Sequence, residues 1–419
     1  MGRGPKGLWY GWVVLAIAFL TMVLAVGIRD AFAVFFVAIL KEFGWSRQLT
    51  AGAFSAGILV QALLSPLAGW LTDRVGPRRL MPAGAFVMAA SLVAASQMSS
   101  PWHLYAVYIF MSIGFVHFTY IPFTAVLPNW FVRRRGLAFG VMMSSIGFRS
   151  VVAVPVQAAI DALGWRLAYV LSAGVIAGVV LPLTALYVRG RPEEVGSVSD
   201  EALLPPSSRR GHLIVDRAWA DRCFTLGSAL ATGRVWSLWA MFFLLGVSYR
   251  LLAAHQVANL VDLGFGELLA AAYIALWGLA VVGGNALSFL SDRWGREGTY
   301  GLGVALSLIG TAFLVSLSGP EARFILFSYL LTLGVGLGIV RPAAQAALAD
   351  IFEGRNFGSI SGAILSSFGA GGAVGPWLGG YIFDRWGNYY WAFLAVGLSL
   401  VGSLGTLLLS SPGKVRSVR

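Results

Sequence analysis

The sequence predicts an all-α membrane protein with twelve transmembrane helices in two similar six-helix bundles, and three observations lead to this fold class. Hydrophobic residues make up 58% of the 419 residues and charged residues only 11%, against roughly 25% in an ordinary soluble domain. The apolar residues form long uninterrupted runs, and the second half of the chain repeats motifs of the first. A soluble domain this apolar would lack a polar surface, so the net charge of +12 does not indicate a nucleic-acid partner.

Twelve runs are long and apolar enough for spanning helices, each of which needs about 20 residues. The expected helices cover residues 9–40, 48–72, 79–98, 102–130, 136–162, 165–188, 235–262, 267–290, 299–317, 321–350, 357–384 and 388–410. None of these runs has the alternating pattern of an outer-membrane barrel strand. The first run exceeds the apolar region of a signal peptide, which has about 7–15 residues, so we expect it to be retained as the first helix.

The distribution of positive charge predicts the orientation in the membrane. With the N-terminus inside, the inside segments hold 21 Lys and Arg residues and the outside segments hold 5. Because cytoplasmic loops carry the excess of positive charge, both termini are expected in the cytoplasm. We therefore expect a multi-pass protein of the cytoplasmic (inner) membrane, surrounded by the lipid bilayer and monomeric. The single cysteine, Cys223, excludes an intramolecular disulfide and a cysteine metal cluster.

One long polar stretch, residues 189–234, is expected to be a cytoplasmic linker between an N-terminal bundle at 1–188 and a C-terminal bundle at 235–419 with a short cytoplasmic tail. Its prolines and serines are typical of linkers, and residues 216–231 are expected to form one short surface helix. Three motifs recur at offsets of 219, 220 and 222 residues, namely Gly69–Arg78 with Ser288–Arg296, Glu42–Trp45 with Asp262–Phe265, and Ser144–Gly147 with Ser366–Gly369. Such duplicated bundles, with a midplane site between them, occur in many secondary transporters.

These motifs support a resemblance to a known family. The loop Asp73-Arg74-Val75-Gly76-Pro77-Arg78-Arg79, its repetition between the eighth and ninth helices, and the six-plus-six arrangement resemble the major facilitator superfamily. Shorter motifs are similar to the bacterial monocarboxylate porter and oxalate/formate antiporter branch: Tyr10-Gly11-Trp12, Gly27-Ile28-Arg29, Phe43-Gly44-Trp45-Ser46, Trp130-Phe131 with Arg133-Arg134-Arg135-Gly136, and Gly164-Trp165-Arg166. The resemblance implies the major facilitator fold and a cytoplasmic gate made by the paired loops. The gate residues implied are Gly69, Asp73, Arg74, Gly76, Arg78, Asp292, Arg293, Gly295 and Arg296.

Elementary physical chemistry gives these loop residues definite tasks. Asp73 lies at a helix boundary, where its carboxylate can accept hydrogen bonds from the N-terminus of a neighbouring helix. Gly69 permits close approach of another backbone, and Gly76 permits a tight turn. The arginines of the loop can pair with acids or lipid phosphates, although plain anchoring at the cytoplasmic surface is an alternative. In the eleventh helix, Gly371 and Gly375 form a small-residue face that we expect to pack against another helix.

Four arginines lie inside the predicted helices, within roughly 8 Å of the bilayer midplane at 1.5 Å per residue: Arg29, Arg149, Arg250 and Arg341. A charge at this depth costs about 2.5–3.5 kcal/mol on insertion scales, so each arginine needs a partner or water. The acid at the same depth is Asp30, which leaves four positive charges against one negative charge in a low dielectric. A bound anion would relieve this repulsion, and the arginine fork can donate two hydrogen bonds to a carboxylate.

The internal repeat adds a tyrosine to this set. Arg29 aligns with Tyr249, and Tyr120 aligns with Arg341; the helices that carry them line the central cavity in the resembled superfamily. The predicted substrate-binding residues are therefore Arg29, Tyr120, Arg149, Arg250 and Arg341. The alternative is that some of these arginines are structural and pair with Asp30 or with the carbonyl groups of broken helices.

Four further residues are candidates for proton coupling or for lining the site: Asp30, His117, His255 and Asn285. Histidine can carry a proton near neutral pH, and the spacing of three between His117 and Tyr120 predicts a shared helix face. Hydrogen-bonded packing is the alternative role for both histidines. The resembled branch often has an arginine late in the eighth helix, where this chain has Asn285 after paired glycines. We therefore hypothesise that Arg149, Arg250 and Arg341 take over anion recognition.

The predicted function is secondary active transport of a small organic anion by alternating access. The anion is a monocarboxylate such as lactate or pyruvate, or a dicarboxylate, and transport is proton-coupled or occurs by anion exchange. The alternative is a multidrug or metabolite exporter of the same superfamily, although exporters of cations favour acids in the cavity. An enzyme would need a coherent set of catalytic groups, and the sequence has no metal-ligand spacing, no nucleophile–base pair and no phosphate-binding loop. No cofactor and no metal are expected.

Overall fold

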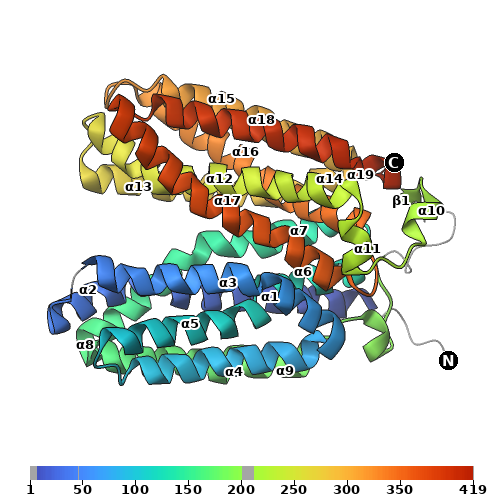
Figure 1. Ribbon diagram of the computed structural model, residues 1–419, viewed down its shortest axis with the longest axis horizontal. Coiled ribbons are helices and arrows are strands. Elements are labelled where there is room, and N and C mark those ends of the chain that lie inside the picture. The colour runs from blue at the N-terminus through green and yellow to red at the C-terminus, as the bar shows by residue number, and fades with distance from the viewer. Residues whose placement is uncertain (1–6, 46, 201–211, 419) are drawn as a thin grey trace. The chain divides into compact units, whose positions relative to one another are not determined.

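The computed structural model describes residues 7–45, 47–200 and 212–418, and these residues are almost entirely helical (Figure 1). The first half contains α1 (Gly7–Asp30), α2 (Phe32–Phe43), α3 (Arg47–Val75), α4 (Pro77–Ala95), α5 (Pro101–Phe118), α6 (Tyr120–Trp130), α7 (Arg135–Ser144), η1 (Ser145–Phe148), α8 (Arg149–Val175), η2 (Ile176–Val180), α9 (Leu181–Tyr187) and η3 (Pro192–Val195). The second half contains β1 (His212–Ile214), α10 (Arg217–Ala220), α11 (Leu226–Leu230), α12 (Gly233–Asp262), α13 (Glu267–Ala286), η5 (Leu287–Leu290), α14 (Ser291–Trp294), α15 (Arg296–Val315), α16 (Arg323–Ile351), α17 (Phe357–Trp386), α18 (Tyr390–Ser410), α19 (Pro412–Val415) and β2 (Arg416–Val418).

All twelve predicted runs are helical, and the predicted fold class is confirmed. Among the described residues, ten continuous segments are long and apolar enough to cross a membrane by length and composition. One of them, Arg135–Tyr187, contains two predicted spans, which are separated at Gly164 with a φ of 82°. Glycine adopts this conformation without the steric penalty that a Cβ atom brings. The predicted run 267–290 corresponds to α13 and the short turn η5 that follows it.

The predicted run 102–130 is interrupted, because the chain leaves the helical conformation at Thr119 with φ −106° and ψ −121°. Three residues later, Pro122 has no N–H group for the carbonyl of Phe118, and its ring would collide with that carbonyl in a continuous helix. His117 therefore lies in the last turn of α5, whereas Tyr120 begins α6. The prediction that these two side chains share one regular helix face is wrong for this reason.

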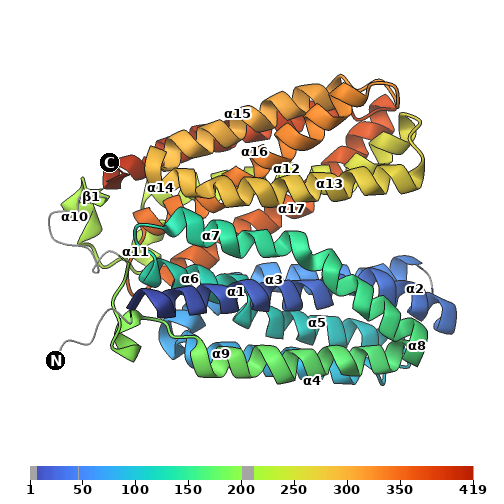
Figure 2. The same ribbon diagram turned by 180° about the vertical axis from the view of Figure 1, so that it is seen from behind.

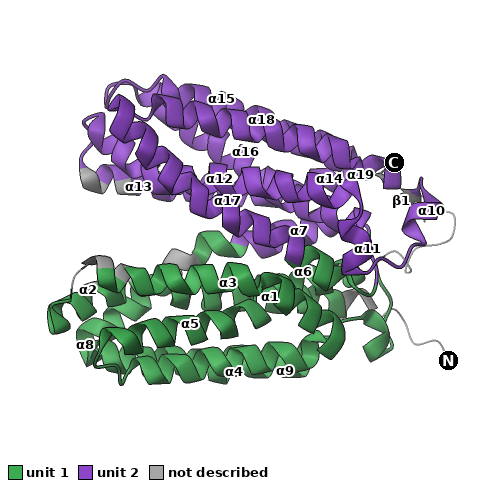
Figure 3. Ribbon diagram, viewed as in Figure 1, with its two compact units in different colours: residues 1–132, 145–205, 355–362 green, residues 133–144, 206–354, 363–419 purple. Residues whose placement is uncertain are grey.

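The described residues form two compact units (Figure 3). Unit 1 comprises the described residues within 1–132, 145–205 and 355–362, and unit 2 comprises those within 133–144, 206–354 and 363–419. In unit 1, α4 packs along α5 and α1 packs along α8. In unit 2, α16 packs between α13 and α15, as Figure 2 shows from behind. The domain boundaries expected from the sequence stay a prediction. Residues 133–144 of the first half belong to unit 2, and residues 355–362 of the second half belong to unit 1. The contacts described below are the reason.

Small residues bring helices into backbone contact within each unit. In unit 1, a Cβ atom placed on Gly84 of α4 would lie 2.8 Å from the carbonyl oxygen of Gly114 on α5. In unit 2, a Cβ atom on Gly371 of α17 would lie 2.0 Å from the carbonyl oxygen of Phe243 on α12, and one on Gly375 would lie 2.5 Å from that of Val247. The predicted packing role of the α17 glycines is therefore confirmed.

The end of the linker and the C-terminal tail meet in unit 2. The single helix expected over residues 216–231 is instead two short helices, α10 and α11, because two separate N-caps start them. Asp216 accepts a hydrogen bond from the N–H of Trp219, and Thr225 accepts one from the N–H of Ser228. Strand β1 pairs antiparallel with β2, with residue 212 opposite 418 and 214 opposite 416.

Candidate functional site

In unit 1, Arg29 is the last residue but one of α1 and lies in a compact polar cluster. Its Nε and Nη2 atoms donate to Oδ1 of Asp30 at 3.1 and 3.0 Å, and its Nη1 atom donates to Oε1 of Gln61 at 2.7 Å. The guanidinium carbon also lies 4.2 Å from the centre of the Phe115 ring. The charge of Arg29 is thus matched by Asp30. This agrees with the alternative that Arg29 is a structural arginine paired with Asp30.

In unit 2, Arg341 of α16 has different surroundings. Its guanidinium carbon lies 5.2 Å from the centre of the Tyr249 ring on α12 and 4.8 Å from the centre of the Phe368 ring on α17. Within the described part of the chain, no carboxylate forms an ion pair with Arg341. The side chain is half-buried in a helix long and apolar enough to span a membrane. A positive charge is therefore held there by aromatic rings rather than by an acid.

The three other predicted substrate-binding residues are Arg250, Tyr120 and Arg149. The aliphatic stem of Arg250 crosses α17, where a Cβ atom on Gly372 would lie 3.0 Å from its Cγ atom. Tyr120 is half-buried at the start of α6. Arg149 is the first residue of α8, and its side chain lies outside the described part of the structure.

The histidines and Asn285 lie at helix contacts. Nδ1 of His117, which is buried, lies 2.6 Å from the Ile113 carbonyl oxygen, and Nε2 of His255 lies 3.0 Å from the Pro376 carbonyl oxygen. Asn285 is buried at the end of α13, where its carbonyl oxygen would lie 2.2 Å from a Cβ atom on Gly140 of α7. Packing is therefore a sufficient reason for the position of all three residues.

The carboxylate of Asp73 caps a helix. Its two oxygens accept hydrogen bonds from the N–H of Gly358 at 2.8 Å and from the N–H and hydroxyl of Ser359, both at 2.6 Å. These N–H groups belong to the first turn of α17, which carries a partial positive charge and lacks intrahelical acceptors. A Cβ atom on Gly69 would lie 2.0 Å from the Gly358 carbonyl oxygen. This contact places residues 355–362 in unit 1.

Asp292 repeats this arrangement in unit 2. Its oxygens accept hydrogen bonds from the N–H groups of Gly136 at 2.9 Å and Leu137 at 3.0 Å, in the first turn of α7. The hydroxyl of Ser288, which corresponds to Gly69 in the repeat, donates to the Gly136 carbonyl oxygen at 2.7 Å. This contact places residues 133–144 in unit 2.

The two loops that carry these aspartates share one backbone conformation. Gly76 has φ 84° and ψ 149°, and Gly295 has φ 86° and ψ 160°, a combination that is essentially confined to glycine. In each loop the arginine after the aspartate lies over the aromatic ring four residues before it, at 5.1 Å for Arg74 and 5.5 Å for Arg293. Arg78 is exposed.

A buried chain of alternating charges extends from Asp292. Arg296 donates to Oδ1 of Asp292 at 2.6 Å and to Oδ2 of Asp350 at 2.7 Å. Arg135, the first residue of α7, donates to Oδ1 of Asp350 at 2.6 Å and to Oε2 of Glu353 at 2.8 Å. Arg135, Arg296 and Asp350 are at most 3% exposed. Charges this deeply buried persist only where they are paired.

The C-terminal tail joins the same chain of charges. Arg416 of β2 forms an ion pair with Glu353, and the N–H of Gly413 donates to Oε1 of Glu297 at 3.2 Å. Burial alone would raise the pKa of Glu353, but the charges of Arg135 and Arg416 outweigh it and hold this pKa below its ordinary value. The tail is therefore tied electrostatically to the residues around the α7 N-terminus.

The sequence matches the family model described as Major Facilitator Superfamily over residues 15–343 and 287–418. The chain belongs to the major facilitator superfamily. Members of this superfamily are transporters and not enzymes, and this facilitator is a multi-pass membrane protein. The resemblance stated from the sequence motifs is confirmed at the level of the family and of the monocarboxylate and oxalate/formate branch.

Curated relatives align along nearly the whole facilitator. It is 28% identical over 434 residues to Monocarboxylate transporter 13 of Rattus norvegicus, covering 96% of this chain and 89% of the relative. It is 27% identical over 413 residues to human Monocarboxylate transporter 11, covering 95% and 82%. It is 24% identical over 411 residues to the Oxalate:formate antiporter of Oxalobacter formigenes, covering 96% and 92%.

Solved structures agree with the fold. The proton:xylose symporter XylE superimposes with a TM-score of 0.71 at 14% identity, covering 96% of this chain and 95% of that one. The fucose:proton symporter FucP of E. coli superimposes with a TM-score of 0.66 at 16% identity, covering 95% and 98%. At these identities the likeness concerns the fold alone.

Several contacts of the facilitator were missed by the sequence analysis. The hydrogen bonds and ion pairs of the following residues were not predicted: Gly358, Ser359, Arg135, Asp350, Glu353 and Arg416. The internal repeat could have indicated some of these positions. At an offset of 222 residues Gly136 aligns with Gly358, and at an offset of 221 residues Asn129 aligns with Asp350. Gln61, Phe115 and Phe368 gave no comparable signal.

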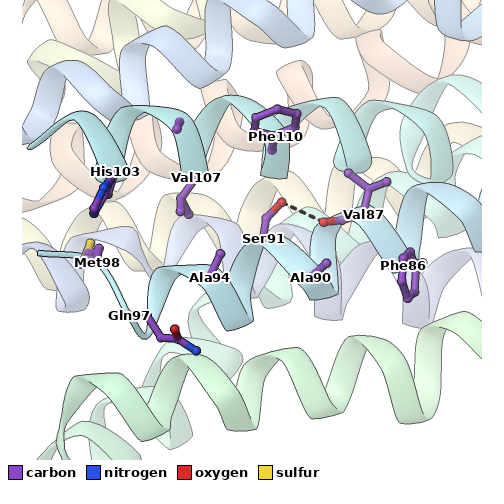
Figure 4. A pocket seen from close by; sticks show the side chains of 11 residues that line it. Phe86, Val87, Ala90, Ser91, Ala94, Gln97, Met98, His103, Val107 and Phe110 are labelled. Atoms are coloured by element: carbon purple, nitrogen blue, oxygen red, sulfur yellow. Dashed lines mark hydrogen bonds between the residues drawn. The ribbon is translucent and has the colours of Figure 1, made fainter. Parts of the chain in front are cut away.

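The hollow drawn in Figure 4 is separate from the predicted site residues. It has a volume of about 420 Å³ and lies between α4 and α5, lined mainly by apolar side chains such as Phe86, Val107 and Phe110. Its buried serine, Ser91, donates its hydroxyl to the Val87 carbonyl at 2.7 Å. None of the predicted site residues lines it, so we assign it no part in the site.

Replacing Asp350 tests the chain of charges. In Asp350→Asn, Arg135 and Arg296 lose the carboxylate that lies between them, and breaking a buried ion pair costs about 3–5 kcal/mol. We expect a clear fall in the thermal unfolding midpoint of the purified protein. The control is Asp384→Asn, which alters an exposed acid and should leave the midpoint unchanged. Equal midpoints for the two variants would contradict the role given to Asp350.

Proposed function

We propose that this facilitator carries a small organic anion, a mono- or dicarboxylate, across the cytoplasmic membrane by alternating access. The observation that carries the proposal is Arg341. Its guanidinium lies in a membrane-spanning helix against two aromatic rings, without an ion-pair partner among the described residues. A carboxylate is the natural ligand of such a group, because the planar fork donates two parallel hydrogen bonds to it.

The comparisons support an anion rather than a neutral sugar. Relatives that align along nearly the whole chain are named as monocarboxylate transporters and as an oxalate:formate antiporter. In this proposal Arg341 is the main carboxylate-binding residue, and Tyr120, Arg149 and Arg250 contribute to the site. Arg29 keeps its ion pair with Asp30 and supplies polar groups. Asn285, at the position where the resembled branch often has an arginine, has a packing role in the contact between α13 and α7.

The orientation and the coupling belong to the same proposal. Both termini lie in the cytoplasm, which is supported by the 21 Lys and Arg residues of the inside segments against 5 in the outside segments. Transport occurs by proton symport or by anion exchange. Asp30, His117 and His255 are the candidate proton carriers.

We also propose that the two aspartate-capped helix starts form the cytoplasmic gate. Asp73 holds the first turn of α17 against the end of α3, and Asp292 holds the first turn of α7 against α14. Both sets of hydrogen bonds would break when the cytoplasmic side opens and form again when it closes. Gly69, Gly76 and Gly295 allow the close approach and the turns, while Arg74, Arg78, Arg293 and Arg296 act as the positive partners of the loops.

The substrate proposal is tested by Arg341→Gln in proteoliposomes loaded for uptake of labelled lactate. A hydrogen bond to a charged group contributes about 1.5–3 kcal/mol, so we expect uptake at low substrate to fall at least about tenfold. The control is Arg323→Gln at the exposed start of the same helix, which should transport like the wild type. Full uptake by the Arg341 variant would refute the assignment.

The gate proposal is tested by the reactivity of a buried cysteine. Cys223, the single native cysteine, is replaced by serine, and Ser361 near the start of α17, which is 0% exposed, is replaced by cysteine. Adding Asp73→Asn removes the capping charge, so we expect the new cysteine to be alkylated faster because the first turn of α17 detaches more often. Asp384→Asn should not change this rate. An unchanged rate in the Asp73 variant would contradict the gate.

A further inference from the structure

The aromatic surroundings of Arg341 have a definite shape. The centres of the Tyr249 and Phe368 rings are 6.1 Å apart, with 60° between the ring planes. Rings on opposite faces of the guanidinium would be separated by nearly the sum of their distances to it, which are 5.2 and 4.8 Å. The two rings therefore form a corner on one side of the guanidinium and leave its other side uncovered by them.

This corner is fixed by hydrogen bonding and by backbone contacts. The hydroxyl of Tyr249 donates to the carbonyl oxygen of Leu337, one helical turn before Arg341 on α16. Phe368 is fixed through its own backbone, because a Cβ atom on Gly246 of α12 would lie 2.3 Å from the Phe368 carbonyl oxygen. Helices α12, α16 and α17 thus hold the two rings and the guanidinium in one arrangement before any ligand arrives.

The corner limits what Arg341 can bind. The face of an aromatic ring is negative, so it attracts the guanidinium and repels a carboxylate. The N–H groups that the rings leave uncovered can donate hydrogen bonds to one carboxylate, while the rings can contact the apolar remainder of the same ligand. A second carboxylate on the ring side of the guanidinium would meet the ring faces, which repel it.

We propose that Tyr249 and Phe368 are positioning residues that make Arg341 select ligands with one carboxylate over ligands with two. This inference rests on the proposed function, since it requires Arg341 to bind the transported anion. The rings act through the guanidinium: they hold it by one side, present its N–H groups in a fixed direction, and exclude a second negative charge. Selectivity between anions, rather than transport itself, is the property that they set.

The test compares pyruvate, which has one carboxylate, with malonate, which has two, as ligands of the purified full-length protein. We measure the ratio of the two dissociation constants for the wild type, Phe368→Leu and Tyr249→Phe. Cation–π contacts contribute about 0.5–2 kcal/mol, so losing the Phe368 ring should weaken pyruvate binding about 2- to 30-fold and reduce the preference over malonate. Tyr249→Phe keeps its ring but loses the hydrogen bond to Leu337, so the ratio should shift less and in the same direction.

Two controls separate positioning from general damage. Phe383→Leu makes the same change on α17 next to Tyr389, with a ring-centre distance of 4.5 Å to that ring, and should keep the wild-type ratio. Phe368→Tyr retains a ring and should recover most of the preference lost in Phe368→Leu. An unchanged ratio in both Phe368→Leu and Tyr249→Phe, while Arg341→Gln abolishes binding of both anions, would overturn this inference and leave the proposed function standing. Unchanged binding in Arg341→Gln would refute the proposed function itself.

Discussion

The free-energy cost of a charge at membrane depth is the constraint on which the rest of this structure depends. Insertion scales put that cost at about 2.5–3.5 kcal/mol for an arginine or aspartate, so a charge inside a spanning helix persists where something compensates it. Arg29 is compensated by Asp30. At the end of α16, where burial in protein rather than bilayer depth sets the cost, Asp350 is compensated by Arg135 and Arg296. Arg341 differs, because aromatic rings rather than an acid surround it. That difference distinguishes a structural arginine from a candidate ligand-binding one.

The two halves stabilise the equivalent aspartates, Asp73 and Asp292, by the same kind of helix-capping contact, but the additional partners of the two carboxylates differ. In both, the carboxylate lies against the first turn of a helix that is distant in sequence. Asp73 gains a third hydrogen bond from the hydroxyl of Ser359, whereas Asp292 faces Leu137 at the corresponding position and is paired with Arg296 instead. Through Arg296 the second aspartate joins a longer chain of charges. We infer that the contact of Asp292 is the more strongly held of the two.

Features that depend on local sequence were predictable, and features that depend on distant partners were not. The twelve helical runs followed from hydropathy, and the turns at Gly76 and Gly295 followed from the repeat and from the conformations open to glycine. The break at Thr119 was missed because hydropathy does not distinguish a continuous helix from one interrupted before a proline. The pairing of Arg135 with Asp350 was missed because these residues are 215 positions apart and Arg135 reads in the sequence as one of three adjacent cytoplasmic cations. The ring corner around Arg341 joins three helices, and no spacing in the chain encodes it.

The central claim is that the site recognises the negative charge of a carboxylate. The most direct measurement compares the thermal unfolding midpoint of the purified protein with lactate and with lactamide, a neutral analogue of nearly the same shape. A ligand that binds the folded state stabilises it by RT ln(1 + L/Kd), where L is the free ligand concentration, and so raises the midpoint as its concentration increases. The account predicts a concentration-dependent rise with lactate and none with lactamide. Equal stabilisation by both compounds, or stabilisation by organic cations in place of lactate, would contradict it.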